Sequence, residues 1–393
     1  MAKNKFESYF DDEEPERVAL VALITDKDEN AAMASLDELW RLVETAGGEV
    51  AARVTQSKDK PDPATYIGSG KVKELSELCR NAQITLAVFD CELSPSQIKN
   101  LEDAMGDVRV IDRSMLILDI FALHATTGEG KLQVELAQLR YTVPRLVGRG
   151  IELSRQGGSG SIAARGPGES KLETDRRYIK RRMVALEERI AEMDKNRRTQ
   201  RVKRERSGMK CVTVAGYTNA GKSTLLNQLT DAGILAQDKL FATLDPTTRR
   251  LKLPSGKTVL LTDTVGFIRN LPHHFIKAFK STLDEVRYAD IILMLMDASD
   301  PECLNQAKVT MELLSELGAG EKHVLYVFNK CDKAEKDDPD FVLPVIPEAK
   351  SEDVFAISAL TGRGISKLVA RIDELIPMPR GYDPSKYNYS YEE

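Results

Sequence analysis

The apolar positions of residues 17–125 alternate between short continuous runs and helical spacing. Apolar and β-branched side chains dominate four short runs, at 17–24, 49–54, 84–90 and 108–111. Between and after them, apolar residues recur at helical spacing over residues 32–46, 70–82, 94–104 and 115–124. Strands that alternate with helices of this length form βαβ units, so we predict an N-terminal α/β domain built on a parallel sheet.

The same alternation returns in residues 211–378. Strand-like runs occur at 211–215, 258–262, 291–296, 324–328 and 354–357. Helical spacing lies between these runs, which predicts a second α/β domain. The flanking segments 1–16 and 379–393 are polar and lack periodicity, and we expect both to be flexible ends.

Heptad stripes occupy residues 126–210, between the two α/β regions. A short stripe consists of Leu132, Leu136 and Leu139, and a longer one consists of Ile179, Met183, Leu186, Ile190 and Met193. Two such stripes predict a helical hairpin with antiparallel coiled-coil packing. The segment between them, residues 148–177, is rich in glycine and serine, which predicts a basic loop that does not pack into a core.

The charge of the chain is unevenly distributed. The 393 residues include 56 Lys and Arg against 61 Asp and Glu, and the net charge of −5 excludes a protein that is basic throughout. Residues 165–207 hold 15 Lys and Arg against 8 Asp and Glu, a balance of +7 that leaves −12 for the rest. The basic run at 194–206 is either a solvated helix face or a surface for phosphate backbones, and its excess of one sign favours RNA contact.

Cysteine usage and hydropathy indicate the compartment. The five cysteines are scattered and form no C-x-x-C pair, which disfavours a disulfide scaffold or a zinc ribbon and favours a reducing environment. No apolar run approaches the roughly 18–20 residues of a membrane span, and the N-terminus has no apolar signal segment. We therefore expect a cytoplasmic monomer without stable membrane insertion.

The most specific chemical signal is a glycine-rich loop between a strand-like run and a helix. In this spacing backbone N–H groups surround the α- and β-phosphates of a nucleotide, Lys222 reaches the β- and γ-phosphates, and the Ser223 hydroxyl binds Mg²⁺. A glycine turn that only caps a helix is disfavoured, because the full pattern arises by chance with odds of about one in a hundred in such a chain. The predicted cradle consists of Gly216, Tyr217, Thr218, Asn219, Ala220, Gly221, Lys222 and Ser223.

A D-x-x-G motif follows the next apolar strand. Its residues are Asp263, Thr264, Val265 and Gly266. The Asp263 carboxylate can hold the Mg²⁺ shell through water, and the Gly266 N–H can meet the γ-phosphate.

Two further motifs at strand ends select the base. They consist of Asn329, Lys330, Cys331 and Asp332, and of Ser358, Ala359 and Leu360. The Asp332 carboxylate can accept both N1–H and N2–H of guanine, which adenine does not offer, and the second motif supplies a backbone contact to the guanine O6. The predicted ligands are GTP as substrate and GDP as product, with Asn329 and Asp332 choosing guanine.

Weaker signals have ordinary alternatives. The run from Gly68 to Lys71 suggests a second phosphate site, but it lacks the four-residue loop, so a helix start is favoured. His273 and His274 are adjacent and point apart on any regular element, which favours surface polarity over a metal pair. We interpret His124 as a core or boundary histidine.

The motifs in combination resemble the HflX family of P-loop GTPases, within the translation-factor-like class. The resemblance rests on GYTNAGKST, LFATLDPTTR, TDTVGFIRNLPH and NKCD, on TYIGSGKVKEL at 65–75, and on RGPGESKLETDRR at 165–177. It covers about residues 17–378 and implies an N-terminal α/β domain followed by a Ras-like GTPase domain. It also implies a GTP hydrolase that binds the large ribosomal subunit and its RNA and splits or rescues stalled ribosomes.

The resemblance adds a switch segment to the predicted site. The segment consists of Phe241, Ala242, Thr243, Leu244 and Asp245. In the family pattern the Thr243 hydroxyl completes the Mg²⁺ shell, whereas Thr247 and Thr248 are alternatives that spacing does not exclude. The predicted metal ligands are then Ser223, Thr243 and Asp263, and the predicted catalytic groups are Lys222, Thr243 and Gly266.

The sequence departs from the GTPase pattern in two places. Phe267 stands where many GTPases carry the glutamine that orients the attacking water, so we expect slow basal hydrolysis that the ribosome activates. Many family members have a further C-terminal domain, where this chain has a short Tyr-rich tail after Pro379. Two alternatives stay open: a nucleotide-gated binding module in which turnover is incidental, and an assembly GTPase that binds immature ribosomal particles.

Overall fold

The computed structural model describes residues 15–25, 29–155, 167–206, 208–230, 240–241, 246–269 and 285–377. The chain divides into two units, residues 1–191 and 192–393, and each unit is described by itself. Among the described residues, none of the helices is both long enough and apolar enough to cross a membrane.

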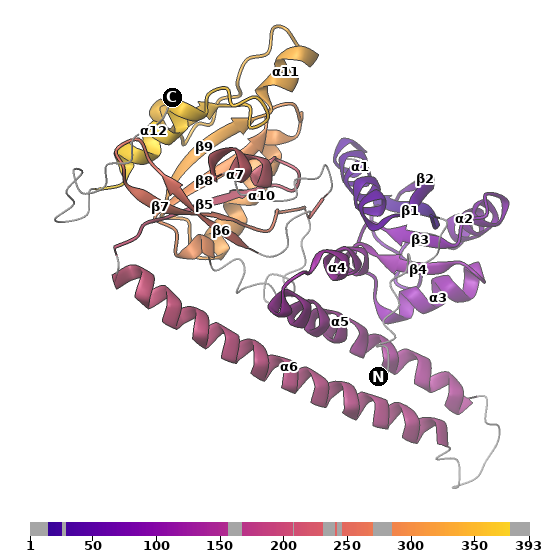
Figure 1. Ribbon diagram of the computed structural model, residues 1–393. Helices are drawn as coiled ribbons and strands as arrows, with labels where there is room; N and C mark the ends of the chain where they lie inside the picture. The colour runs from indigo at the N-terminus through magenta and orange to yellow at the C-terminus, as the bar shows by residue number, and fades with distance from the viewer. Residues whose placement is uncertain are drawn as a thin grey trace. The chain divides into compact units, whose positions relative to one another are not determined.

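The first unit contains a four-stranded parallel sheet with the order β2-β1-β3-β4. Its strands are β1 (Arg17–Ile24), β2 (Glu49–Ser57), β3 (Leu86–Phe89) and β4 (Arg109–Asp112). Its helices are α1 (Glu29–Ala46), α2 (Ser69–Asn81), α3 (Pro95–Met105) and α4 (Arg113–His124). The helices cover both faces of the sheet (Figure 1), so the predicted α/β domain on a parallel sheet is confirmed.

Apolar side chains fill both faces of this sheet. On one face Ile67, Leu75 and Leu101 from the α2 and α3 side pack against Val21 and Phe89 of the strands. Helix α3 begins where the sequence favours it, because Ser94 and Gln97 form a reciprocal capping box and Pro95 occupies the first turn. The two covered faces leave the ends of the strands as the places where polar side chains gather.

Helices α5 (Gly128–Arg155) and α6 (Pro167–Arg206) form the predicted hairpin. Figure 1 shows the first part of α6 running beside α5 in the opposite direction. Both predicted stripes contribute to one apolar cluster, which consists of Leu132, Leu136, Leu139, Ile179, Met183, Leu186 and Ile190. Ion pairs flank this cluster, from Arg182 to Glu135 at 2.7 Å and from Arg140 to Glu187 at 2.7 Å.

The loop expected at 148–177 is shorter than predicted. Residues 148–155 continue α5 and residues 167–177 belong to α6, so only residues 156–166 lie outside the described part of this segment. The prediction counted the glycines of the whole segment, but few of them follow Pro167. Pro167 has the backbone angle that favours a first helical residue, and good helix formers come after Gly168.

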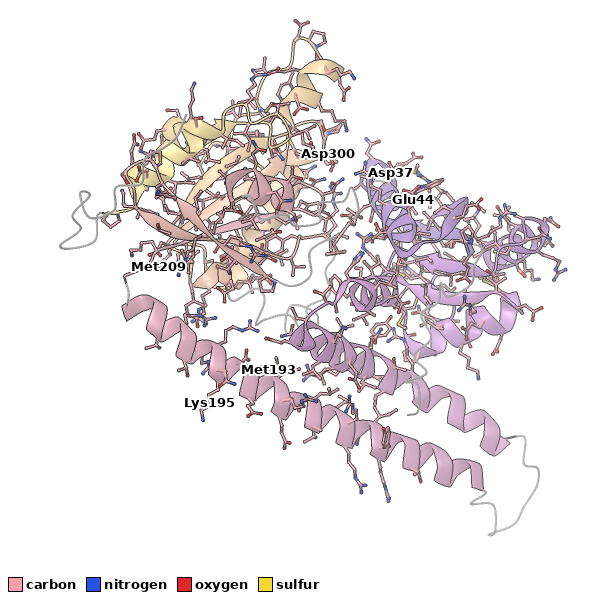
Figure 2. The ribbon with its side chains drawn as sticks, in the orientation of Figure 1. Asp37, Glu44, Met193, Lys195, Met209 and Asp300 are labelled. Atoms are coloured by element: carbon pink, nitrogen blue, oxygen red, sulfur yellow. The ribbon has the colours of Figure 1, made fainter. Side chains whose placement is uncertain are left out.

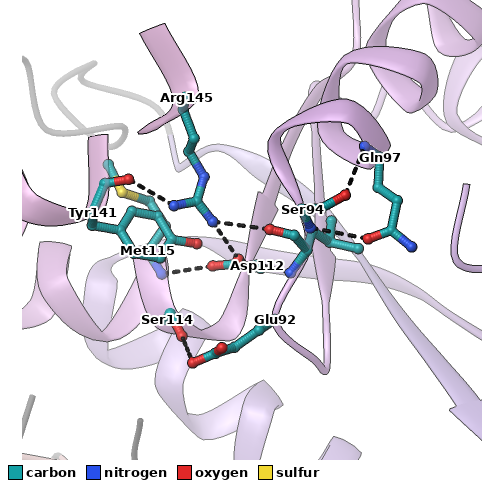
Figure 3. A network of polar contacts seen from close by, with 9 residues as sticks. Glu92, Ser94, Gln97, Asp112, Ser114, Met115, Tyr141 and Arg145 are labelled. Atoms are coloured by element: carbon teal, nitrogen blue, oxygen red, sulfur yellow. Dashed lines mark hydrogen bonds and ion pairs between the residues drawn. The ribbon is translucent and has the colours of Figure 1, made fainter. Parts of the chain in front are cut away.

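Asp112 ties α5 to the carboxyl end of β4, as Figure 3 shows. Its buried carboxylate accepts hydrogen bonds from the backbone N–H groups of Met115, at 2.9 Å, and Leu93, at 3.0 Å. Arg145 of α5 donates to the same carboxylate at 3.1 Å and to the Leu93 carbonyl at 3.0 Å, and its guanidinium stacks on the ring of Tyr141. Burial raises the pKa of Asp112, whereas these hydrogen bonds and the Arg145 charge oppose that rise.

A buried cation, Arg113, lies at the same edge of the first sheet. Arg113 forms ion pairs with Glu38 of α1 at 2.5 Å and with Asp90, directly after β3, at 2.7 Å. The charges at this edge therefore neutralise one another and connect α1, β3 and α4.

The second unit contains a six-stranded sheet with the order β10-β9-β8-β5-β7-β6. Its strands are β5 (Cys211–Gly216), β6 (Thr247–Lys252), β7 (Thr258–Asp263), β8 (Ile291–Asp297), β9 (His323–Asn329) and β10 (Val354–Ala356). Strand β6 is antiparallel to β7, and the other strand pairs are parallel. The predicted α/β class is confirmed, but β6 was missed because its sequence TTRRLK is polar and faces solvent at the sheet edge.

Helices cover both faces of this sheet as well. They are α7 (Lys222–Thr230), α10 (Cys303–Glu316), α11 (Cys331–Asp337) and α12 (Ile365–Leu375), with a 3₁₀ turn, η1 (Ser351–Asp353). Leu225 of α7 and Leu368 of α12 belong to one core cluster, and Cys303 and Ala307 of α10 belong to another. Strand β5 lies between β7 and β8. After β5 the chain builds β6 and β7 on one side of it and then crosses to β8 on the other side, so the direction of the strand order reverses at β5. That is the position where open α/β sheets bind ligands.

The C-terminal part of α6 belongs to the second unit. The Arg201 guanidinium lies 3.6 Å from the centre of the Tyr288 ring and 3.4 Å from the Glu285 carboxylate. Lys195 of α6 is exposed, and Figure 2 shows its side chain projecting away from the helix.

Candidate functional site

The glycine-rich loop connects β5 to α7 at the carboxyl edge of the second sheet. A Cβ at Gly216 would lie 2.3 Å from the Leu295 carbonyl oxygen, and one at Gly221 would lie 2.3 Å from Nδ2 of Asn329. Gly221 also has a φ of +93°, which side chains with a Cβ rarely adopt. Glycine at these positions therefore lets the loop pass close to β8 and to the strand-end segment at 329.

Lys222 is buried at the first turn of α7. Its Nζ donates to the Tyr217 carbonyl at 2.8 Å, and the side chain is 7% exposed. Burial lowers the pKa of Lys222 to about 8; the Asp263 charge opposes this shift and the Lys330 charge adds to it. The Tyr217 carbonyl positions this cation at the loop, and a bound phosphate would raise its pKa again.

Ser223 and Asp263, two of the predicted metal ligands, place their side-chain oxygens next to each other. The Ser223 hydroxyl donates to Oδ2 of Asp263 at 2.9 Å, and the Asp263 side chain is fully buried at the end of β7. A hydroxyl and a carboxylate are the hard ligands that Mg²⁺ prefers, and Mg²⁺ usually keeps several waters and phosphate oxygens rather than a protein cage. The described residues contain no group of three or more His, Cys, Asp or Glu placed to hold a metal.

Asn329 joins three of the predicted motifs. Its amide nitrogen donates to the Ala220 carbonyl at 2.8 Å, and its amide oxygen accepts from the Ala359 N–H at 2.8 Å. The side chain is almost fully buried. The sequence predicted a role for Asn329 in the choice of base. It did not predict that the Asn329 amide links the glycine-rich loop to the segment at 359, because the order of the motifs along the chain gives no signal for that contact.

The other residues predicted to select the base lie around Asn329. Lys330 has a φ of +61°, and its Nζ pairs with Asp297 at 2.7 Å. Asp332 is half-buried in the first turn of α11, and Cys331 is buried beneath it. Ser358 and Ala359 are buried, whereas Leu360 is exposed. The structure thus brings the two predicted base-selecting motifs to the same sheet edge as the loop.

The segment after Gly266 pairs with the glycine-rich loop. Phe267 donates its N–H to the Gly216 carbonyl at 3.1 Å and accepts from the Thr218 N–H at 2.8 Å, and its side chain is 1% exposed. The Tyr217 phenol oxygen accepts from the Arg269 N–H at 2.6 Å. The buried Thr218 Oγ1 has no hydrogen-bond partner among the described residues. This pairing was not predicted from the sequence, where Phe267 stood out only as an apolar residue at the position of the water-orienting glutamine.

The switch segment lies mostly outside the described residues. Phe241 is described and buried, but Ala242, Thr243, Leu244 and Asp245 are not part of the described ranges. The alternatives Thr247 and Thr248 belong to β6, and the Thr248 hydroxyl lies 3.0 Å from the Thr262 hydroxyl.

The weaker sequence signals have mixed outcomes. Helix α2 begins at Ser69 directly after Gly68 and has no side-chain cap, and Lys71 pairs with Glu74 at 2.9 Å. His124 is half-buried at the end of α4, as expected of a boundary histidine. The pair at 273–274 lies outside the described residues.

Comparison with known proteins matches the chain to three family descriptions. Residues 33–122 match "GTP-binding GTPase N-terminal", residues 124–204 match "GTP-binding GTPase Middle Region", and residues 211–330 match "50S ribosome-binding GTPase". A GTPase HflX of Lacrimispora saccharolytica is 49% identical over 374 residues, which cover 95% of this chain and 86% of that protein.

Two other proteins are similar over most of the chain. A GTPase HflX of Escherichia coli is 43% identical, with coverage of 91% of this chain and 82% of that protein. A solved structure described as the complex of SsGBP and GDP is 25% identical, with a TM-score of 0.48 and coverage of 92% and 98%. Because GTPases HflX are 43% and 49% identical to it over more than nine-tenths of its length, the chain belongs to the HflX family and is a P-loop GTP hydrolase.

Proposed function

We propose that this protein binds the large ribosomal subunit through RNA contacts and hydrolyses GTP with Mg²⁺ at a rate that the subunit controls. The relevant setting is translation under stress, where it would split or rescue stalled ribosomes. The observation that carries this proposal is the row of exposed cations on α6 of an otherwise acidic chain, among them Arg176, Arg177, Lys180 and Arg181. The description of the matching GTPase family as 50S ribosome-binding agrees with it.

Each predicted group has a role that its position supports. Lys222 would stabilise charge on the β- and γ-phosphates, and the Gly266 N–H would contact the γ-phosphate. Ser223 and Asp263, with Thr243 from the switch segment, would hold Mg²⁺, which when bound neutralises the phosphate oxygens. Asp332 would read guanine, while Asn329 keeps the base-reading segment fixed to the phosphate loop.

The buried Phe267 supports slow turnover in the absence of the ribosome. An apolar side chain cannot hydrogen-bond the attacking water, and here it is turned into the protein, 1% exposed. A polar group supplied by the ribosome, or a switch segment that the ribosome orders, would provide what Phe267 does not.

GTP turnover measured with and without purified large subunits tests the proposal. We expect slow hydrolysis by the isolated protein and acceleration of at least about 10-fold by the subunits. Fast hydrolysis by the isolated protein contradicts the role given to Phe267. GTP-dependent subunit binding without any acceleration favours the alternative of a nucleotide-gated binding module.

The α6 surface is tested by charge removal. The variant Arg176→Gln/Arg177→Gln should bind large subunits more weakly, and the log–log slope of affinity against salt should flatten by up to about 0.7–0.9 for each phosphate that is no longer neutralised. The matched control is Lys73→Gln/Arg80→Gln, which removes two exposed cations of α2. If both variants behave alike, α6 is a solvated face and RNA recognition lies elsewhere.

A further inference from the structure

Strand β6 (Thr247–Lys252) is the outermost strand of the second sheet. In the described part of the chain it pairs with β7 alone, so one of its two backbone edges is turned away from the sheet. Leu251 belongs to the core and fixes the strand, whereas Arg249 and Arg250 are exposed and form no ion pair among the described residues. A strand edge of this kind can accept a further strand, and its two cations favour an acidic one.

The polypeptide returns to this edge at the end of α12. A short turn joins β6 to β7, and Ser255 of this turn donates its N–H and its hydroxyl to the Asp373 carboxylate, at 2.8 and 2.6 Å. The Lys257 Nζ donates to the Ile376 carbonyl at 2.7 Å. The end of α12 is therefore fastened to the turn, and the chain that follows begins beside the carboxyl end of β6.

The tail, residues 379–393, lies outside the described residues, but its sequence suits an added strand. The segment as a whole has no periodicity, yet its last part places tyrosine at every second position, at Tyr387, Tyr389 and Tyr391. Alternation of aromatic and polar side chains is typical of a strand that packs on one face. The stretch 387–393 also contains two glutamates and no Lys or Arg, which complements the cations of β6.

The connection between α12 and this stretch is long enough for the contact. An extended chain rises about 3.3 Å per residue, so residues 377–386 can span up to about 33 Å, whereas the six residues of β6 span about 20 Å. Since the connection starts beside the turn, the shortest path makes an added strand run antiparallel to β6. A short flexible connection also gives the tail an effective concentration of about millimolar, which favours it over a second copy of the chain.

We propose that residues 387–392 of the tail dock on β6 as an added antiparallel strand of the second sheet. Backbone hydrogen bonds supply the attraction, and the tyrosine rings and glutamates lie across from Arg249 and Arg250. Strand β6 begins at Thr247, which is in register with Asp263 of β7. The docked tail therefore runs towards the sheet edge that carries the predicted nucleotide site.

Hydrogen exchange of the full chain, followed by mass spectrometry, tests this docking. The variant Ser390→Pro removes a backbone donor from the middle of the added strand and interrupts its ladder. We expect the amides of 387–392 and of β6 to exchange at least about 5-fold more slowly in the unaltered chain than in this variant. The matched control, Ser385→Pro, introduces proline outside the added strand and should exchange like the unaltered chain.

A second variant alters the other partner. Arg249→Gln/Arg250→Gln should speed exchange of the tail amides by about 2- to 5-fold, because it removes the charges that face the glutamates. Its control is Lys308→Gln/Lys336→Gln, which removes two exposed cations of α10 and α11 and should change nothing in the tail.

Three outcomes would overturn the proposal. Tail amides that exchange as fast as unstructured chain would show that the arginines only keep other strands away from the edge. Protection of the tail that neither variant reduces would place it on another surface. Protection that increases with protein concentration, together with a dimer in sedimentation velocity, would assign β6 to the tail of a second copy.

Discussion

The carboxyl edges of the two sheets carry similar charged side chains and use them differently. In the first unit Arg113 is paired with Glu38 and Asp90, and Arg145 is paired with Asp112. In the second unit the Nζ of Lys222 donates to a backbone carbonyl and forms no ion pair among the described residues. The first edge neutralises its own charge, whereas the second keeps a cation for a ligand.

The two edges also differ in how closely their backbone segments approach one another. The edge of the second sheet has glycine at 216, 221 and 266, where an added Cβ would meet atoms at 2.3 to 2.7 Å. These glycines let the phosphate loop, the D-x-x-G strand end and the base-reading segment approach one another. At the edge of the first sheet, side chains such as Arg113 and Asp112 fill the corresponding place and fix helices to strands. Two sheets of similar topology therefore differ at their edges. A ligand site forms only where a cation has no ion-pair partner and glycines leave the backbone without side chains.

The largest effect is expected when the uncompensated cation is removed. Lys222→Ala should weaken binding of GDP and GTP by at least about 100-fold, because the phosphates lose charge-assisted hydrogen bonds. Calorimetric titration measures this loss. The control is Lys257→Ala: Lys257 is also 7% exposed, and its Nζ donates to the carbonyls of Asp373 and Ile376 at 2.6 and 2.7 Å. That variant should lose stability and keep its nucleotide affinity, and a Lys222→Ala protein with unchanged affinity would refute the contrast.

The choice of base is expected to depend on Asp332, another residue at the edge of the second sheet. Asp332→Asn replaces an acceptor with a donor, which suits the C2 carbonyl of xanthine and leaves the guanine amino group unpaired. We expect the preference between GTP and xanthosine triphosphate to shift by at least about 10-fold towards the latter. Competition binding with both nucleotides measures the ratio. A variant that still prefers GTP would remove Asp332 from base recognition.

The edge of the first sheet, where the charges form ion pairs with one another, is tested by measuring stability instead of nucleotide binding. In the variant Asp112→Asn one carboxylate oxygen becomes an amide NH₂ group. This donor would face another donor, which is the Met115 N–H, the Leu93 N–H or the Arg145 guanidinium, so at least one hydrogen bond is lost. We expect the free energy of unfolding of the first unit to fall by about 2–4 kcal/mol, with nucleotide affinity unchanged. The chain has one tryptophan, Trp40 on α1, so its fluorescence in urea reports on this unit. Unchanged stability would show that the network is not required for the fold.

A pH-dependent effect is expected from a carboxyl group of the first unit that lies outside this network. Burial raises the pKa of Asp119 to about 7, and Oδ2 has no hydrogen-bond partner among the described residues. Between pH 3.8 and 7 the folded state keeps a proton on Asp119 that the unfolded state has released. The stability of the fold therefore decreases as pH rises across this range and levels off above it.

Asp119→Asn should abolish that pH dependence. Between pH 5.5 and pH 8 the unaltered protein should lose about 2 kcal/mol relative to the variant, from roughly 1.5 pKa units at 1.36 kcal/mol each. Urea unfolding at both pH values, followed through Trp40, measures the difference. Parallel pH profiles for the two proteins would contradict the raised pKa.

The parallel strands of both sheets and the nucleotide motifs could be predicted from the sequence. Buried strands are apolar throughout and alternate with amphipathic helices, and a phosphate loop needs its glycines, lysine and serine at fixed spacing. The heptad positions also predicted which residues pack in the hairpin, from Leu132 to Ile190. These are local patterns, in which each residue type reports its own environment.

The features that were missed depend on contacts between distant residues. The edge strand β6 is polar, so it lacks the apolar signature of a buried strand. Asn329, Arg145 and Tyr217 act through partners that lie 109, 33 and 52 residues away in the chain. Single-sequence patterns carry no information on such pairs, because any polar side chain at these positions gives the same local signal.

The two bonds of Asn329 have a consequence for engineering. One amide fastens the phosphate loop through Ala220 and the base-reading segment through Ala359. Substitutions at 329 would therefore damage catalysis and base recognition together, and a library that randomised this position would yield mainly inactive clones. Redesign for an orthogonal nucleotide should hold 329 constant and vary 332, where one carboxylate can be exchanged while both hydrogen bonds of Asn329 stay intact.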